Sequence, residues 1–142
     1  SGLLSYRVDT LPDSDPFEVG LNKMISLDRT DKFIGKTALR RKAEQGLTRK
    51  LVGIVINGEP LVPNEHPWPT NVDGKLAGSV RAACYSPRRE ENIGIALLAV
   101  QYSGLGMELE IESDGGLKSG KIVPLPLVPP GTPIPKGGQR IL

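Results

Sequence analysis

The sequence predicts a mainly β protein with an α+β N-terminal part: one amphipathic helix, then short antiparallel strands that close into a small barrel or pair into a sandwich. Near residue 50 the spacing of apolar residues changes from a 3.6-residue to a two-residue rhythm. The 142 residues include 17 Gly and 13 Pro, which favours many short elements joined by turns. At least five strand patterns follow in about 75 residues.

The segment before the helix begins with a capping pattern. Asp15 precedes Pro16, and Glu18 follows at the third helical position, so Asp15 is predicted to cap a short helical turn. Gly20 limits this element to about one turn. Residues 21–27 alternate loosely between apolar and polar positions, which predicts a short strand.

Residues 34–45 carry the clearest helix pattern in the chain. Good helix formers fill the segment, basic residues gather in its C-terminal half, and Gly46 can end it. The apolar residues that share one helical face are Ile34, Ala38, Leu39 and Ala43. This amphipathic helix therefore needs a partner surface.

Apolar runs with a two-residue period, separated by turn signals such as Asn57-Gly58, Asp73-Gly74 and Asp114-Gly115, predict the strands. They are expected over residues 51–56, 76–84, 93–100, 107–112 and 121–125. In the fourth of them the glutamates at 108, 110 and 112 alternate with apolar residues, which indicates a solvated face rather than a metal site. From residue 129 the Pro/Gly-rich sequence predicts a tail without regular structure.

Composition excludes several classes of function. The net charge of +2 gives no strong field for nucleic acid, and no apolar run reaches the ~18 residues of a membrane span. One Cys and one His exclude the common zinc sets, so no metal is expected. A single Cys also fits a reducing compartment, and with no signal-peptide pattern the expected location is cytoplasmic.

Four features could carry chemistry, and for each the structural interpretation is favoured. His66 could be a base but stands among prolines, which favours an exposed loop residue. Cys84 lies in a β run and is expected to be a small buried hydrophobe. Gly104-Leu105-Gly106 is expected to be a hairpin bend rather than a phosphate loop. Trp68 could cover one end of the barrel or stack on a planar ligand, and the first is favoured.

A basic cluster spans the end of the helix and the start of the first strand. A solvated helix face is the favoured interpretation, and a contact for a polyanionic ligand tail is the alternative. The cluster consists of Arg40, Arg41, Lys42, Arg49 and Lys50.

Several short motifs, in matching order and spacing, resemble the C-terminal part of the glycine cleavage T-protein family of folate-dependent aminomethyltransferases. The resemblance covers about residues 1–128. The motifs are Asp15-Pro16-Phe17-Glu18-Val19-Gly20-Leu21, Phe33-Ile34-Gly35-Lys36-Thr37-Ala38-Leu39, Arg49-Lys50-Leu51-Val52-Gly53-Ile54, Gly78-Ser79-Val80, Tyr85-Ser86-Pro87, Asn92-Ile93-Gly94-Ile95-Ala96 and Gly120-Lys121-Ile122-Val123-Pro124-Leu125-Pro126.

The resemblance implies a three-domain protein with folate at its centre and an antiparallel Greek-key β-barrel as its last domain. Residues 1–47 are then the end of the middle domain plus a connector helix, 48–128 the barrel domain, and 129–142 a Pro/Gly-rich tail. The chain also begins without Met, inside an apparent apolar segment, which adds to the expectation of a fragment.

The implied activity is one-carbon transfer to tetrahydrofolate in the full-length protein, from a small one-carbon donor. The catalytic Asp and the pterin-binding Glu of the family lie upstream, so no catalytic residue is expected here and the chain alone is predicted to be inactive. Tyr6 matches a tyrosine near the folate site of the family, although Arg7 replaces the glycine that usually follows it. Tyr6 is therefore the one expected cofactor-binding residue.

Two alternatives remain open. Gly58-Glu59-Pro60-Leu61, with Asn64 and Pro67-Trp68-Pro69, looks more like the dimethylsulfoniopropionate demethylase branch of the superfamily, which also uses tetrahydrofolate. The other alternative is a non-catalytic barrel module for partner docking. Its basic cluster would then face an acidic partner such as the lipoyl carrier protein.

Overall fold

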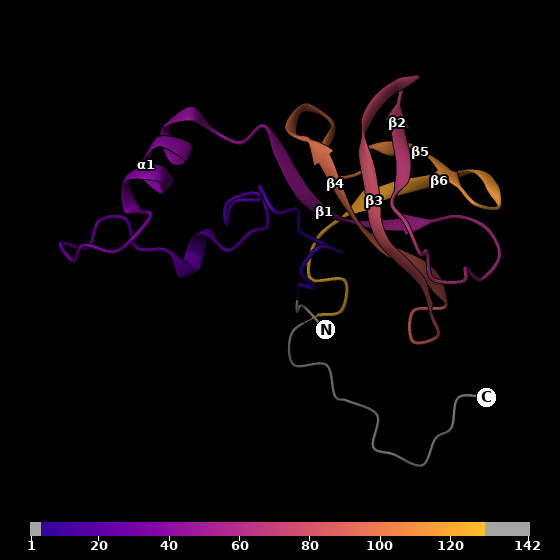
Figure 1. Cartoon of the computed structure of the whole chain (residues 1–142). Coiled ribbons are helices and arrows are strands. Elements are labelled where there is room, and N and C mark those ends of the chain that lie inside the picture. The colour runs from indigo at the N-terminus through magenta and orange to yellow at the C-terminus, as the bar shows by residue number, and fades with distance from the viewer. Residues whose placement is uncertain (1–3, 130–142) are drawn as a thin grey trace, which may run out of the picture.

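The computed structural model describes residues 4–129, in which six strands form a closed barrel (Figure 1). The strands are β1 (Arg49–Ile56), β2 (Trp68–Val72), β3 (Lys75–Ser86), β4 (Glu91–Ala99), β5 (Glu108–Ser113) and β6 (Gly116–Val123). All neighbours are antiparallel, in the order β1-β4-β3-β2-β5-β6. Because β2, β3 and β4 follow one another and β1 returns beside β4, the predicted Greek-key barrel is confirmed.

The alternation seen in the sequence places the apolar side chains inside the barrel. In β5, Leu109 and Ile111 are buried whereas the glutamates that alternate with them are exposed, as predicted. All six strands contribute to one apolar core. Its buried members are Val52, Ile54, Ile56, Trp68, Val72, Ala77, Val80, Ala83, Ala96, Leu98, Leu109, Ile111 and Ile122.

Strand β2 is the one strand that the sequence pattern did not predict. Pro69 lies at its second position, and proline normally argues against a strand because it cannot donate to the ladder. The ladder between β2 and β5 pairs only Thr70 and Asn71 of β2, so Pro69 lies outside it. The barrel therefore tolerates a proline in a strand that has neighbours on both sides.

Strand β1 is buried on part of its outer face as well as on the face that points into the barrel. Leu51 and Leu97 face each other across the β1–β4 ladder and are buried, although neither belongs to the barrel core. A methyl group at Gly53 would lie 2.9 Å from the Cδ2 atoms of both Leu125 and Leu127. The absence of a side chain at Gly53 thus lets the segment after β6 pack across β1.

The capping turn predicted at Asp15 is present. Asp15 Oδ1 accepts hydrogen bonds from the backbone N–H groups of Phe17 and Glu18, at 2.9 and 3.1 Å. The strand predicted over residues 21–27 is wrong, because a 3₁₀ turn, η1 (Asn22–Met24), stands there. Within residues 4–129 no strand lies beside this segment to pair with it, so local hydrogen bonds satisfy its backbone instead.

Helix α1 (Lys36–Gln45) confirms the predicted helix and begins two residues later than expected. It projects away from the barrel (Figure 1), and none of its residues is buried. Ile34, which was expected on its apolar face, precedes the helix and is fully exposed. Among the described residues, no helix has the length and apolar character that a membrane crossing requires.

Candidate functional site

Tyr6 lies on a tight turn near the start of the described chain, and 68% of its surface is exposed. The turn is closed by hydrogen bonds between Ser5 and Asp9. The Asp9 N–H donates to Ser5 O at 2.9 Å, and the buried Asp9 carboxylate accepts from Ser5 N at 2.8 Å. The Arg7 guanidinium carbon lies 5.8 Å from the centroid of the Tyr6 ring. The ring is therefore accessible to a planar ligand, on a turn whose backbone is internally bonded.

This turn is attached to the barrel by Arg81 of β3. The Arg81 Nε donates to Val8 O at 2.8 Å, and Nη2 donates to Arg7 O at 3.2 Å. Arg7 itself adopts a left-handed backbone conformation, with φ of +66°. One guanidinium thus joins the barrel to the segment that carries the expected folate-contacting residue.

The His66 and Trp68 side chains converge on one carboxylate, that of Asp114 in the β5–β6 turn. The His66 Nε2 lies 2.9 Å from Asp114 Oδ1, and Trp68 Nε1 donates to Asp114 Oδ2 at 3.0 Å. His66 is exposed, as expected, whereas Trp68 is buried in the barrel core. The structure therefore argues against stacking of Trp68 on a ligand, because a buried ring offers no face to one.

We expect Asp114→Ala to lower the free energy of unfolding by about 1–2 kcal/mol, because the buried Trp68 N–H loses its acceptor. The emission of Trp68, the only tryptophan, reports on the change during denaturant unfolding. Asp114→Asn, which keeps an acceptor oxygen, is the matched control and is expected to cost less. Equal stability of Asp114→Ala and the wild type would contradict this prediction.

The expectation that Cys84 is buried is wrong, because its side chain is exposed. The β3–β4 register shifts between Val80 and Ala82, so the buried positions of β3 do not follow one uninterrupted alternation. Ala83 points into the barrel, and Cys84, its neighbour, therefore points out.

The Gly104-Leu105-Gly106 segment forms a turn, with Gly106 N donating to Ile122 O at 2.9 Å. It is not the expected hairpin bend, because the strands it joins, β4 and β5, are not neighbours in the barrel. The segment follows the 3₁₀ turn η2 (Val100–Tyr102) and leads into β5. The segment connects two strands that are not adjacent in the barrel. A strand follows it, whereas a dinucleotide-binding loop is followed by a helix.

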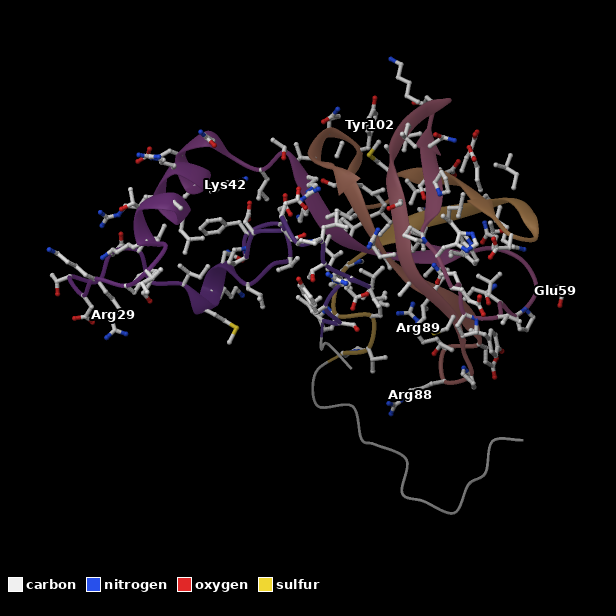
Figure 2. The ribbon with its side chains drawn as sticks, viewed as in Figure 1. Arg29, Lys42, Glu59, Arg88, Arg89 and Tyr102 are labelled. Carbon is white, nitrogen blue, oxygen red and sulfur yellow. The ribbon has the colours of Figure 1, made fainter. Side chains whose placement is uncertain are left out.

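Three members of the basic cluster hold the N-terminal segment together. Arg40 Nη2 donates to Leu27 O at 3.1 Å, and Lys42 Nζ lies 3.6 Å from Asp15 Oδ2. Figure 2 shows Lys42 on α1, far from the barrel. The cluster is therefore not one free surface, and mainly Arg41 and Lys50 remain for an outside partner.

Arg49, the third of these members, forms the most buried ion pair within residues 4–129 for which a distance is given. Its Nε lies 2.7 Å from Oε1 of Glu18, which is only 3% exposed, and its Nη2 lies 3.1 Å from Asp13 Oδ1. The hydrogen bond from Arg49 holds the pKa of Asp13 below its usual range. Leu51 N also donates to Glu18 O at 2.8 Å. This contact fixes the capping turn to the first strand of the barrel.

Hollows in the described part of the chain include two that lie outside the barrel core. One of about 480 Å³ lies over β1 and β6 and is lined by both signs of charge. Arg89, labelled in Figure 2, is one of its lining residues and pairs with Glu91 at 2.9 Å. The other, of about 360 Å³, lies beside α1, with Met24, Phe33 and Leu39 among its lining. No set of three or more His, Cys, Asp or Glu within residues 4–129 is grouped to hold a metal ion.

Sequence reasoning did not identify Arg81 or Asp114 as residues that organise these loops. Asp114 was assigned only to a turn, and its two partners, His66 in a loop and Trp68 at the start of β2, lie 46 or more residues earlier in the chain. A signal for Arg81 is present in hindsight, since it is the one charged residue inside the run from Gly78 to Cys84.

Comparisons with known proteins agree on one family. A model of the glycine cleavage T-protein C-terminal barrel domain matches residues 49–129. The chain is 40% identical over 124 residues to an aminomethyltransferase of Listeria welshimeri, covering 87% of this chain and 34% of that protein. It is 34% identical over 118 residues to the dimethylsulfoniopropionate demethylase DmdA of Ruegeria pomeroyi, covering 83% and 32%. The chain thus spans about a third of the length of the curated relatives it matches.

A solved structure supports the same fold. The aminomethyltransferase T of the glycine cleavage system from Bartonella henselae superimposes with a TM-score of 0.75 over 89% of this chain and 36% of that one. The sequences are 21% identical, so this likeness concerns the fold.

Proposed function

We propose a function from one premise: the chain belongs to the glycine cleavage T-protein family, whose C-terminal barrel domain it carries. It acts as the C-terminal third of a longer cytoplasmic enzyme that transfers an aminomethyl-derived one-carbon unit to tetrahydrofolate. The observation that carries this proposal is the 40% identity to an aminomethyltransferase, which extends from the barrel into the N-terminal segment. Residues 1–47 then complete the preceding domain, and residues 129–142 form a tail, mostly outside the described part.

The role of the chain in this reaction is to enclose and position rather than to react. A closed barrel supplies a rigid wall that excludes water from an adjoining site, and the chain alone is therefore inactive. Tyr6 fits a contact to the pterin ring of tetrahydrofolate, since its own ring is exposed and stands on a bonded turn. No catalytic residue is assigned to this chain.

The test joins this chain to the upstream two thirds of the Listeria welshimeri aminomethyltransferase, in place of that protein's own last third. We expect aminomethyl transfer by the chimera, with none by the isolated chain. Turnover by the isolated chain, given tetrahydrofolate and a one-carbon donor, would contradict the proposal that this chain supplies no catalytic residue. An inactive chimera whose two parts fold would contradict the family activity proposed here.

Substitution of Tyr6 tests the folate contact in the same chimera. Stacking of an aromatic ring on a planar heterocycle contributes about 1–3 kcal/mol. We therefore expect Tyr6→Ala to weaken tetrahydrofolate binding about tenfold, as measured by calorimetry. Tyr6→Phe keeps the ring and is the matched control, with near wild-type affinity. Equal affinity of Tyr6→Ala and the wild type would remove Tyr6 from the site.

A second candidate function is demethylation of a dimethylsulfoniopropionate-type donor, again with tetrahydrofolate as acceptor. Two observations favour it: the 34% identity to DmdA, and the loop around Asn64. A methylated sulfonium donor offered to the full-length enzyme distinguishes the two branches. Production of 5-methyltetrahydrofolate from this donor supports the demethylase. No product from this donor, together with methylenetetrahydrofolate formed from an aminomethyl donor, supports the aminomethyltransferase.

Docking of a lipoyl carrier protein is a third proposal. Fewer basic residues are available for this contact than the sequence suggested. Arg40, Lys42 and Arg49 are held by partners inside the chain. A carrier would therefore meet chiefly Arg41 and Lys50, and exposed charges of this kind are screened by salt.

A further inference from the structure

Strand β3 contains an extra residue, and that residue is Arg81. On the β4 ladder Val80 pairs with Ala96 and Ala82 pairs with Ile95, so Arg81 has no partner between them. A bulge of this kind bends the strand and changes the direction of one side chain, and bulges are frequent next to functional sites. Here the redirected side chain is the guanidinium that reaches the Tyr6 turn.

Asn64 fixes the bulge from the loop between β1 and β2. Its Oδ1 accepts from Ala83 N at 2.8 Å, and its Nδ2 donates to Arg81 O at 3.3 Å. The same Nδ2 donates to His66 O at 2.8 Å. The side-chain amide thus bonds backbone groups of β3 beyond Val80, the last residue of β3 that pairs with β2. Asn64 therefore braces the backbone of the bulge that carries the Arg81 side chain.

The guanidinium in turn holds a strained backbone. Arg7 has φ of +66°, a conformation that costs a residue with a side chain about 1–2 kcal/mol and persists only where its surroundings enforce it. Two donors of Arg81 bond the consecutive carbonyls of Arg7 and Val8. The planar fork of arginine can make both bonds at once, whereas lysine presents a single point charge.

We propose that Arg81 is a positioning residue for the folate site: braced by Asn64, it holds the strained Arg7 turn so that the Tyr6 ring is presented to tetrahydrofolate. This inference rests on the proposed function of Tyr6. Arg81 does not touch the ligand and acts through the turn. Its loss therefore affects tetrahydrofolate affinity rather than the chemical step.

The first experiment tests the attachment itself, without any ligand, in the 142-residue chain. Amide hydrogen exchange is measured at Val8 and Asp9, whose N–H groups both donate to Ser5 O. We expect Arg81→Met to accelerate exchange at both amides at least tenfold, and Arg81→Lys to give an intermediate value. Arg41→Met, on the exposed helix, is the matched control. Exchange in Arg81→Met within twofold of this control would overturn the attachment.

The second experiment tests the positioning role in the complete transferase. We expect Arg81→Met to raise the Kd and KM for tetrahydrofolate about fivefold to tenfold with kcat nearly unchanged, and Arg81→Lys to recover part of the loss. A merely structural role would instead lower the thermal midpoint and the active fraction without this split. An unchanged KM in Arg81→Met, or a loss confined to kcat, overturns the positioning role.

Tyr6→Ala separates the inference from the function on which it rests. Suppose that Tyr6→Ala weakens folate binding and that adding Arg81→Met to this variant weakens binding no further. Both the folate contact of Tyr6 and the positioning role of Arg81 are then supported, because the two residues act as one unit. If Tyr6→Ala weakens binding and Arg81→Met does not, the positioning role fails and the folate contact stands. If Tyr6→Ala changes nothing, the folate contact and the positioning role fail, while the exchange experiment still decides the attachment.

Discussion

Gly78→Ala is expected to destabilise the barrel by more than about 4 kcal/mol, the range reached only by severe structural conflicts. Gly78 lies in β3 between β2 and β4, opposite Thr70 and Leu98. A methyl group there would lie 2.1 Å from Leu97 O and 2.9 Å from Leu98 Cα. Both are backbone atoms of the adjacent strand, so the clash cannot be relieved by rotating a side chain.

Thermal unfolding followed by Trp68 fluorescence measures this effect. Gly74→Ala is the matched control, because Gly74 also has a positive φ but a methyl group added there would meet no atom within 4 Å. Its cost should be limited to the left-handed backbone penalty of about 1–2 kcal/mol. Since domains of this size are typically stable by about 5–15 kcal/mol, Gly78→Ala consumes much of the total. A Gly78→Ala chain as stable as Gly74→Ala would contradict the close approach of β3 and β4.

Arg49→Met is expected to release the capping turn from β1, at a cost of about 3 kcal/mol. The variant leaves the Glu18 carboxylate buried without its cation, and Glu18 Oε2 already has no hydrogen-bond partner among the described residues. Faster exchange of the Leu51 amide, which donates to Glu18 O, reports the release.

The double variant Glu18→Gln with Arg49→Met is the control for this effect. It removes the buried charge together with its partner, so it should be more stable than Arg49→Met alone. A Leu51 amide that exchanges equally fast in the wild type and in Arg49→Met would contradict the assigned role of the pair.

The single variant Arg49→Met is also expected to change the pKa of Asp13. The hydrogen bond from Arg49 lowers the pKa of Asp13 in the folded protein. A lowered folded-state pKa contributes stability above the unfolded-state pKa, and this contribution is lost as the pH falls through the folded-state value. In Arg49→Met the carboxyl midpoint, followed by NMR, is therefore expected to rise.

The elements predicted correctly are those whose signals lie close together in the sequence. The helix over residues 36–45 and the cap at Asp15 were predicted because their signals lie within a few neighbouring residues. The strand expected over residues 21–27 did not form, because strand pairing needs a neighbour that no local pattern can supply. Cys84 was misplaced for a related reason: a bulge three residues earlier shifts the alternation.

The candidate site was predicted less completely than the fold. Tyr6 was identified through the resemblance of its surroundings to a family, and the structure adds that its ring is exposed. The roles of Arg81 and Asn64 depend on hydrogen bonds between residues that lie 17 and 74 positions apart in the sequence. No periodicity in the sequence reports contacts of that range.

The amino-acid order by itself determined the change from helix to strands near residue 50 and the inward face of most strands, because these depend on spacing between near neighbours. The family was identified from the sequence through the resemblance of its motifs. Only the tertiary structure decided the partners of Arg49, Arg81 and Asp114, the burial of Trp68 and the position of the bulge. Hydrogen bonds between distant side chains depend on distances in space that exist only after the barrel has closed.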